Sequence, residues 1–381
     1  MLLAVGACGF HPGVAPGDSN VANDVAADVA AIDAPPAKCL GLWCRRKAIA
    51  LHGAVGGPHV DFPIVIDLAS DADVAAAARA DGFDLLFADA AGTKLAYERC
   101  AFKAMGRLLA WVKVPSLTAK TVIYLYYGNT AATDQAQPMM TWSAGYQGVW
   151  HLETPTPPYP DSSGHSNTAT VNAGVTAGAN GALGKAAQLA ASKQGFLTMM
   201  NSASLDSTAS AGTFEALLDW TNAASGSYQF IMTSSNRFGG TFDGFEWASQ
   251  GGGAHYFYPW ADPAQNDYNL GPNPFTNGAW HHAAVTLDFA TTAVILYVDG
   301  APIPLTTVNV PATWTQVANP ANWLWGGNPG YSGTVGYFDG MMDELRVASV
   351  VRSADWIATA AANQLVPASF YTLGPEEMLV P

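Results

Sequence analysis

Two carboxylates in the last third of the chain are the first residues whose types could do chemistry. Asp343 stands where a strand is predicted to begin, and a carboxylate there either ties down neighbouring backbone or holds a metal ion. Glu344 follows directly, and we expect it to face solvent or to pair with Arg346. Because neighbouring strand residues point to opposite faces, Asp343 and Glu344 are not expected to work as an acid/base pair.

Aromatic residues crowd into the stretch that holds Trp247, Tyr258 and Trp260, with carboxylates and amides nearby. Sugar-binding sites commonly set an aromatic ring against the C–H face of a sugar and use carboxylates or amides for its hydroxyls. Tyr258 and Trp260 precede a loop rich in Pro, Asp and Asn, so we take them as candidate ligand-binding residues, together with Trp247 and Asp262. The alternative is that alternating aromatic residues fill the core of a β-sandwich.

No familiar catalytic motif accompanies these residues. The sequence has no Gly-x-Ser-x-Gly, His-Glu-x-x-His or phosphate-loop pattern. Asp243 and Glu246 lie three apart and so face opposite sides of a strand, although a polysaccharide hydrolase with a non-standard carboxylate pair around Asp243 and Asp262 is an alternative. His281 and His282 are adjacent in a predicted strand, which predicts one buried and one exposed imidazole rather than a metal site.

Composition predicts a β-rich protein that does not bind nucleic acid. The 381 residues suggest two or more domains, and 49% of them are apolar while only 12% are charged. The 38 Gly and 24 Pro indicate many turns. A formal net charge of −14 argues against nucleic-acid binding, which needs basic patches, and is ordinary for an exported protein.

Short β-like runs separated by turn residues divide the chain into two predicted antiparallel β-sandwiches. Residues 39–129 predict a small sandwich with one short helix within 71–80. The runs from 145 to 374 predict a larger sandwich of roughly 12 strands. Residues 130–144 are interpreted as a polar connector and residues 375–381 as a tail. The predicted fold class is therefore all-β.

The first residues predict a lipid anchor. Residues 1–8 are mostly apolar and end in Val5-Gly6-Ala7-Cys8, and small residues before a cysteine resemble a bacterial lipobox. Cys8 is therefore a predicted lipidation site, and the segment 9–38, whose charge is mostly acidic, is a predicted disordered tether. These features predict an exported lipoprotein of the bacterial cell envelope, periplasmic or surface-exposed.

The other cysteines, Cys39, Cys44 and Cys100, all fall in the first predicted sandwich. In an exported protein one disulfide is expected, which leaves one thiol over. Cys39–Cys44 would close a small loop, whereas Cys44–Cys100 would pin the first strand to a later one. We do not expect these cysteines to bind a metal ion, because no Cys-x-x-Cys motif or histidine cluster accompanies them.

The first predicted sandwich contains, in order, the strings Trp43-Cys44-Arg45-Arg46, Asp61-Phe62-Pro63-Ile64-Val65, Phe83-Asp84-Leu85-Leu86-Phe87-Ala88-Asp89 and Tyr124-Leu125-Tyr126-Tyr127-Gly128-Asn129. In these strings and their order it resembles a bacterial family of exported proteins, domain of unknown function 2341. The family has no established activity, so the resemblance assigns no functional residue.

The second predicted sandwich contains three distinctive strings, Asp161-Ser162-Ser163-Gly164-His165-Ser166-Asn167, Trp280-His281-His282-Ala283-Ala284-Val285-Thr286-Leu287-Asp288 and Phe338-Asp339-Gly340-Met341-Met342-Asp343-Glu344-Leu345-Arg346. On these strings it resembles the concanavalin A-like, laminin-G-type lectin/glucanase superfamily, which implies a jelly-roll fold. Glucanases of this superfamily carry Glu-x-Asp-x-Glu or Glu-x-Asp-x-x-Glu on one strand face, and this chain has neither pattern.

Many members of the superfamily bind a structural Ca²⁺ where the early Asp-rich turn meets the last strand. Carried over position by position, the resemblance implies Asp161, Asn167 and Asp343 as oxygen ligands of Ca²⁺. The alternative is that Asp161 makes an Asx-turn and that Asp343 caps local backbone.

Together these observations predict a non-catalytic binding protein of the cell envelope. Its laminin-G-like module would recognise a glycan or a surface protein. A polysaccharide hydrolase and a structural surface spacer or adhesin are the alternatives.

Overall fold

The computed structural model describes residues 37–381 apart from 104–106, 209–210, 222–226, 235–243, 251–253, 261–266, 273, 305–306, 310–320 and 331–334. The predicted signal segment with Cys8, almost all of the predicted tether, Asp243 and Asp262 therefore lie outside the described residues. No helix among the described residues combines the length and the apolar character that a membrane crossing requires.

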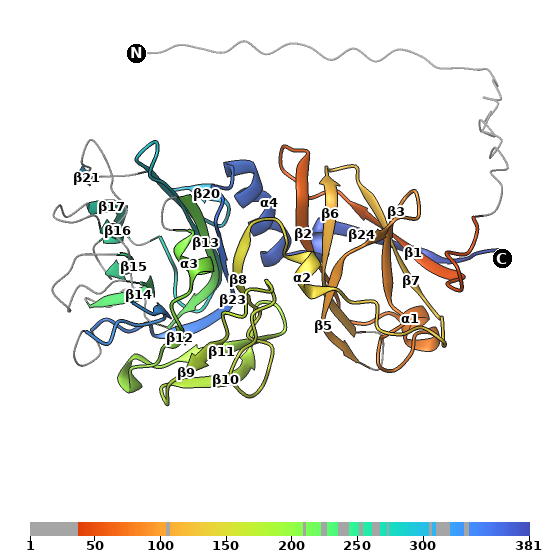
Figure 1. The fold of residues 1–381 in the computed structure, drawn as a ribbon, viewed down its shortest axis with the longest axis horizontal. Coiled ribbons are helices and arrows are strands. Elements are labelled where there is room, and N and C mark those ends of the chain that lie inside the picture. Colours follow the sequence, from red (N-terminus) through yellow and green to blue (C-terminus); the bar gives the residue numbers. More distant parts are fainter. Residues whose placement is uncertain are drawn as a thin grey trace, which may run out of the picture. The chain divides into compact units, whose positions relative to one another are not determined.

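The first sandwich consists of two antiparallel sheets that enclose an apolar core (Figure 1). One sheet has the order β24-β1-β7-β3-β4 and the other the order β2-β6-β5. The strands are β1 (Arg45–Leu51), β2 (His59–Leu68), β3 (Leu86–Asp89), β4 (Lys94–Leu95), β5 (Tyr97–Lys103), β6 (Arg107–Leu117), β7 (Val122–Tyr127) and β24 (Tyr371–Met378). Alternating apolar residues such as Ile64 and Leu125 fill the core, as the period of a half-buried strand requires.

The second sandwich consists of two larger antiparallel sheets. One has the order β10-β11-β23-β13-β18-β19-β20, with β8 also on β23, and the other β21-β17-β16-β15-β14-β22-β12-β9. The strands are β8 (Tyr146–Trp150), β9 (Ala169–Val171), β10 (Val175–Asn180), β11 (Lys185–Leu189), β12 (Leu197–Met199), β13 (Ala211–Trp220), β14 (Tyr228–Thr233), β15 (Gly244–Gln250), β16 (Ala254–Trp260), β17 (Asp267–Pro272), β18 (Trp280–Asp288), β19 (Ala293–Val298), β20 (Ala301–Pro302), β21 (Thr307–Asn309), β22 (Trp323–Trp325) and β23 (Gly340–Ala348). The predicted all-β fold with antiparallel sandwiches is confirmed.

The helices are few and short. They are α1 (Ala72–Ala77), α2 (Pro138–Thr141), α3 (Ala203–Asp206), α4 (Ala354–Leu365) and α5 (Pro367–Phe370), with a 3-10 turn at Ala191–Lys193. Helix α1 is the helix predicted within 71–80, and Asp71 caps its start by accepting a hydrogen bond from the backbone N–H of Val74.

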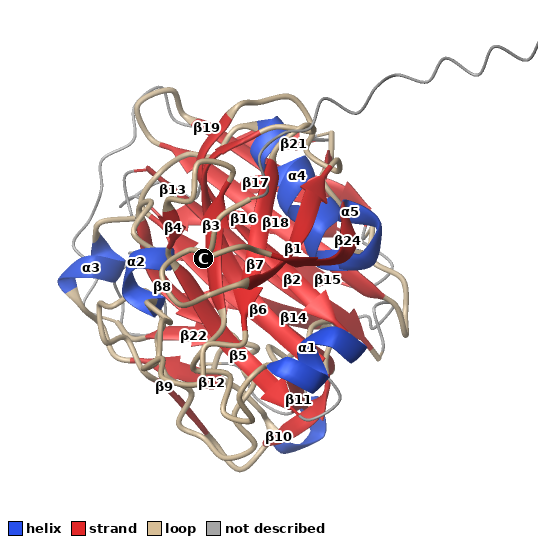
Figure 2. Cartoon of the chain, turned by 90° about the vertical axis from the view of Figure 1, so that its right-hand side faces the viewer, coloured by secondary structure: helices blue, strands red, loops and turns tan. Residues whose placement is uncertain are grey.

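The end of the chain returns to the first sandwich. Strand β24 pairs with β1, and Figure 1 shows the two side by side. Helix α4 connects the second sandwich to the first, because Asn363 bonds both backbone groups of Val65 in β2. Figure 2 shows α5 next to β24, and α4 contacts β2 and β18. The sequence predicted that the second sandwich extends to residue 374 and that residues 375–381 form a tail. In the structure, β24 extends to Met378 and belongs to a sheet of the first sandwich, since an edge strand can pair with a segment distant in sequence.

The two sandwiches meet through the outer faces of two sheets. Leu109 and Trp111 of β6 pack in one buried cluster with Trp142, Tyr146 and Leu217.

Cys39 and Cys44 form the disulfide, which decides between the two predicted pairings, and Cys100 of β5 is free.

Candidate functional site

A β-bulge in β23 places two acidic residues on the same face of its sheet. The pairing of β23 with β13 shifts register between Asp343 and Arg346, and Glu344 has a φ of 52°. Met342 and Leu345 both enter the core of the second sandwich. Asp343, Glu344 and Arg346 therefore share the outer face. This corrects the expectation that Asp343 and Glu344 face opposite ways, because the extra residue of a bulge breaks the alternation of the strand.

His151, which directly follows β8, lies between the buried carboxylate of Glu344 and the partly buried carboxylate of Glu98. Its Nδ1 atom is 2.8 Å from Oε2 of Glu344, and its Nε2 atom is 3.0 Å from Oε2 of Glu98. Glu98 belongs to β5, so this imidazole joins the second sandwich to the first. Glu344 also accepts a 2.8 Å hydrogen bond from Nη2 of Arg346. The predicted pairing of Glu344 with Arg346 is confirmed, whereas the alternative of a solvent-facing Glu344 is wrong.

Neutral donors and aromatic rings complete this network. Glu98 accepts hydrogen bonds from Nε1 of Trp142 at 2.6 Å and from Oγ of Ser162 at 2.7 Å. The Arg346 guanidinium lies over the ring of Trp111, 4.1 Å from its centroid. Each buried charge therefore has a partner, as burial demands.

The carboxylates decide the charge of the histidine. Burial would lower the pKa of His151, but the negative charges of Glu344 and Glu98 raise it to about 10. Burial would likewise raise the pKa of Glu98, but His151, Ser162 and Trp142 lower it below its usual value. The structure thus favours the imidazolium form of His151 beside an ionised Glu98.

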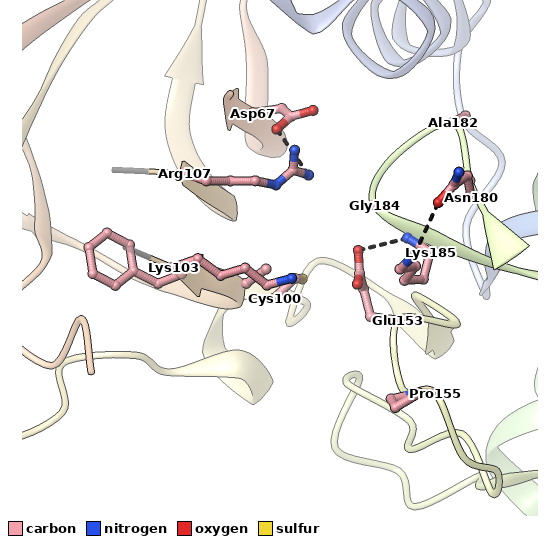
Figure 3. Close-up of a pocket in the computed structure, with 13 residues that line it drawn as sticks. Asp67, Cys100, Lys103, Arg107, Glu153, Pro155, Asn180, Ala182, Gly184 and Lys185 are labelled. Atoms are coloured by element: carbon pink, nitrogen blue, oxygen red, sulfur yellow. Dashed lines mark hydrogen bonds and ion pairs between the residues drawn. The ribbon is translucent and has the colours of Figure 1, made fainter. Parts of the chain in front are cut away.

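A polar pocket of about 760 Å³ lies beside this network, with walls from both sandwiches (Figure 3). The first sandwich contributes Asp67, Cys100, Ala101, Phe102, Lys103 and Arg107, and the second contributes Glu153, Pro155, Asn180, Gly181, Ala182, Gly184 and Lys185. Asp67 and Arg107 form an ion pair with a 3.5 Å separation. Burial raises the pKa of Asp67 and of Glu153 above their usual values.

The loop 181–184, which contains Gly181 and Gly184, contacts the carboxylates of Asp343 and Glu153. Glu153 accepts a hydrogen bond from the backbone N–H of Lys185 at 3.0 Å, and Asp343 accepts one from Leu183 at 3.0 Å. Gly184 has a φ of 75°, and a Cβ atom there would collide with the Glu153 carboxylate. Only glycine meets both conditions without strain. The loop therefore fixes Glu153 at the pocket wall.

Cys100 connects the pocket with the buried network. Its sulfur, a Glu98 carboxylate oxygen and a His151 ring nitrogen all lie within 4.8 Å of one another. Burial raises the pKa of the Cys100 thiol well above its usual value, and Glu98 and Glu344 raise it further. The thiol is therefore not activated as a nucleophile in this state.

The residues predicted to bind calcium have other partners. Asp161 accepts hydrogen bonds from the backbone N–H groups of Val149, Ser163 and Asn167, which is the Asx-turn alternative. The side chain of Asn167 bonds Ser202 and other groups of the second sandwich. Asp343 bonds Leu183 instead. These partners fit a backbone-tying turn better than a calcium shell, and calcium binding stays a prediction.

The aromatic candidates divide into two groups. Trp247 is fully buried in the core of the second sandwich, and its Nε1 donates to Nε2 of His255 at 2.7 Å. The structure therefore corrects the prediction that Trp247 contacts a ligand, because alternation along β15 turns its ring inward. Tyr258 and Trp260 belong to β16, but their side chains, like Asp262, are outside the described part of the chain.

The two adjacent histidines behave differently, as predicted. His282 is buried and lies 3.2 Å from Glu215, whereas His281 is partly exposed and pairs with Asp299 at 2.8 Å.

Sequence reasoning missed Glu98, His151 and Glu153 as site residues, and predicted no metal-binding role for Cys100. A local signal did exist, because His151 directly follows the mostly apolar strand β8, where a buried polar residue needs a partner. The partner could not be found in the sequence, since Glu98 lies on the other sandwich.

Two family descriptions match parts of this chain. Residues 81–148 match the family described as domain of unknown function 2341, and residues 192–358 match the concanavalin A-like lectin/glucanases superfamily. The order of the two matches is the predicted order. Glu98 and Cys100 lie within the first match, and Glu344 within the second. No curated protein matches the chain.

Several solved structures are similar to part of this chain. Domain 4 of the extracellular arabinanase AbnA from Geobacillus stearothermophilus, in complex with arabinotriose, is 18% identical with a TM-score of 0.43, over 57% of this chain and 99% of that one. The binding domain of Paraclostridial Mosquitocidal Protein 1 is 12% identical with a TM-score of 0.44, over 59% of this chain. The binding domain of Botulinum neurotoxin DC in complex with SialylT is 10% identical with a TM-score of 0.44, over 58%. The chain covers 52% of each toxin domain.

Proposed function

We propose that this protein binds a glycan, without turning it over, in the pocket between its two sandwiches. The observation that carries the proposal is the lining of the pocket. Planar carboxylates and an amide accept hydrogen bonds from sugar hydroxyls, cationic side chains donate them, and an aromatic ring can lie against the C–H face. Asp67, Arg107 and Phe102 supply such groups from one wall, and Glu153 and Asn180 supply them from the other.

The superfamily that residues 192–358 match is described by its lectins and glucanases, which supports a saccharide as the ligand. The matched region does not include Glu153 and Asn180, and Asp67 and Arg107 belong to the first sandwich. The proposed site is therefore composite, and the laminin-G-like sandwich alone would not form it. A surface protein is the other partner class that the sequence predicted.

We further propose that the protein works outside the cytoplasm as a membrane-anchored lipoprotein. The Cys39–Cys44 disulfide supports an oxidising compartment. Lipidation of Cys8 would supply the anchor, and mass spectrometry of the protein from its native membrane tests it.

A hydrolase is the second candidate. Asp67 and Glu153 face the same pocket from opposite walls, and both have raised pKa values, as a general acid requires. Against this candidate, Asp67 is paired with Arg107, and Oε1 of Glu153 accepts the N–H of Lys185.

A glycan array followed by calorimetry tests the proposal. Lys103→Ala and Asn180→Ala remove hydrogen-bonding groups at opposite walls, so each should weaken binding by roughly tenfold, the loss of about one hydrogen bond to a charged or amide group. Lys120→Ala is the matched control, because Lys120 is an exposed lysine of the first sandwich that does not line the pocket.

Three outcomes decide between the candidates. Binding that both pocket variants weaken and Lys120→Ala does not supports the glycan proposal. A folded protein that retains no glycan, or that binds equally well in all variants, contradicts it. Release of reducing sugar that Glu153→Gln abolishes would establish the hydrolase instead. A parallel arm with a calcium chelator tests the predicted dependence on Ca²⁺ through Asp161, Asn167 and Asp343.

A further inference from the structure

Three side chains of different metal-binding chemistry converge behind the wall of the pocket. Glu98 and Cys100 come from β5, and His151 follows β8 in the other sandwich. One ligand atom from each lies within 4.8 Å of the others. A tetrahedral ion with bonds of about 2.0–2.3 Å holds its ligand atoms roughly 3.3–3.8 Å apart. Small side-chain movements would therefore bring the three atoms around one ion.

The local backbone aims these residues at one another. The pairing of β5 with β6 shifts register between Arg99 and Ala101, so Cys100 is the extra residue of a β-bulge. Bulges re-aim side chains and are frequent next to functional sites. Leu152, directly after His151, has a φ of 57°, and Glu344 has a φ of 52°. Left-handed backbone at residues other than glycine persists only where the surrounding structure holds it in place.

An outer layer of hydrogen bonds already orients two of the three ligands. Glu344 lies 2.8 Å from Nδ1 of His151, which fixes the ring with Nε2 toward Glu98. A carboxylate on the far nitrogen is the usual support of a histidine that ligates a metal. Trp142 and Ser162 hold the Glu98 carboxylate in the same way.

The set of ligands selects the class of ion. Thiolate and imidazole together suit zinc and similar first-row ions, whereas calcium and magnesium prefer oxygen alone. We propose that Glu98, Cys100 and His151 bind one zinc-class divalent cation. Because Cys100 lines the pocket, a water molecule or a ligand oxygen from the pocket could reach the fourth position of such an ion.

The exchange of protons for metal keeps the charge of this buried site constant. Without metal, His151 carries a proton on Nε2 and Cys100 is a thiol. When a divalent ion forms bonds to Nε2 and to the sulfur, those two protons leave to solvent, as metal binding requires. Two positive charges replace two, so the surrounding Glu98, Glu344 and Arg346 need no rearrangement of charge.

Cobalt spectroscopy tests the proposal directly. The full chain carries Cys8→Ser, so that Cys100 is the remaining free thiol beside the Cys39–Cys44 disulfide. After treatment with a chelator and its removal, the protein is titrated with Co²⁺ and then Zn²⁺. We expect one ion per chain and a near-ultraviolet thiolate-to-cobalt band. Cys100→Ser should abolish the band, and Glu344→Gln, an outer-layer change, should weaken Zn²⁺ binding by about 10–100-fold.

His281→Gln is the matched control, since His281 is a partly exposed histidine that pairs with a carboxylate outside this cluster. The Zn²⁺ affinity of this variant should equal that of the parent protein. Cys100→Ala serves as a second variant, with circular dichroism to confirm the fold. The proposal is overturned if the parent chain takes up neither ion. It is also overturned if the Cys100 variants bind as tightly and with the same spectrum. Glycan binding is measured separately, so either failure leaves the proposed function standing.

Discussion

The Nε2 atom of His151 lies 3.0 Å from Oε2 of Glu98, and this contact joins two sandwiches whose strands are distant in sequence. The same imidazole bonds Glu344 through its other nitrogen. A charge that is buried between two domains is costly unless it is paired, so the two sandwiches stabilise each other at this point. The contacts of His151 should therefore affect both the stability of the protein and the dependence of that stability on pH.

His151→Gln should destabilise the protein by about 3–5 kcal/mol, because it removes the cation that pairs with the partly buried Glu98 and leaves the buried Glu344 with Arg346 as its remaining cationic partner. Chemical denaturation measures the change in the free energy of unfolding. His281→Gln removes a partly exposed imidazole–carboxylate pair and should cost no more than about 1 kcal/mol. Equal effects of the two variants would show that the His151 network contributes no special stability.

The stability of the metal-free protein should depend on pH through the same residue. The pKa of His151 is about 10 in the folded protein, above the value of about 6.5 expected when unfolded. The stabilisation is therefore fully present below about pH 6.5 and is lost as the pH rises toward 10. Denaturation at several pH values between 6.5 and 10, with chelator present, should show a steeper decline in the parent than in His151→Gln, which keeps every other titrating group. A free energy of unfolding that does not change with pH in the parent protein would contradict this prediction.

Asp343→Asn should stabilise the protein at neutral pH. Burial raises the pKa of Asp343 well above its usual value, the charge of Glu344 raises it further, and one carboxyl oxygen is buried without a hydrogen-bond partner. Because the folded protein binds this proton more tightly than the unfolded chain, the parent loses stability as pH rises above about 4. Asparagine keeps an acceptor for Leu183 and has no charge to bury. A rise in melting temperature at pH 7 that disappears near pH 3 is the expected signature.

Gly184→Ala should destabilise more than Gly178→Ala. Both glycines have positive φ, 75° and 79°, so the backbone strain of an alanine is similar in the two. Only at Gly184 does the added Cβ atom meet a carboxylate, that of Glu153, whereas the nearest atom at Gly178 is 3.7 Å away. We expect about 1 kcal/mol for Gly178→Ala and about 1–3 kcal/mol more for Gly184→Ala. Equal melting temperatures would mean that Glu153 moves freely.

The sequence by itself determined the local elements and the order of the two units. Turn residues and short β-like runs predicted two antiparallel sandwiches, and the antiparallel sheets of both are observed. Composition indicated the β-rich class, and the parity rule predicted that one of the two adjacent histidines is buried, which the structure shows to be His282. These properties depend on neighbours along the chain, which a sequence displays directly.

Tertiary structure alone decided the pairing of distant segments and thereby the site. Strand β24 joins β1, a bulge turns Asp343 and Glu344 to one face, and His151 meets a carboxylate from the other sandwich. A single extra residue in a strand reverses the faces of the residues around it, and no periodic pattern records it. The packing of two sheets face to face likewise cannot be predicted from the sequence of either sheet alone. For that reason Glu98, Cys100 and His151 appear unrelated along the chain and adjacent in the folded protein.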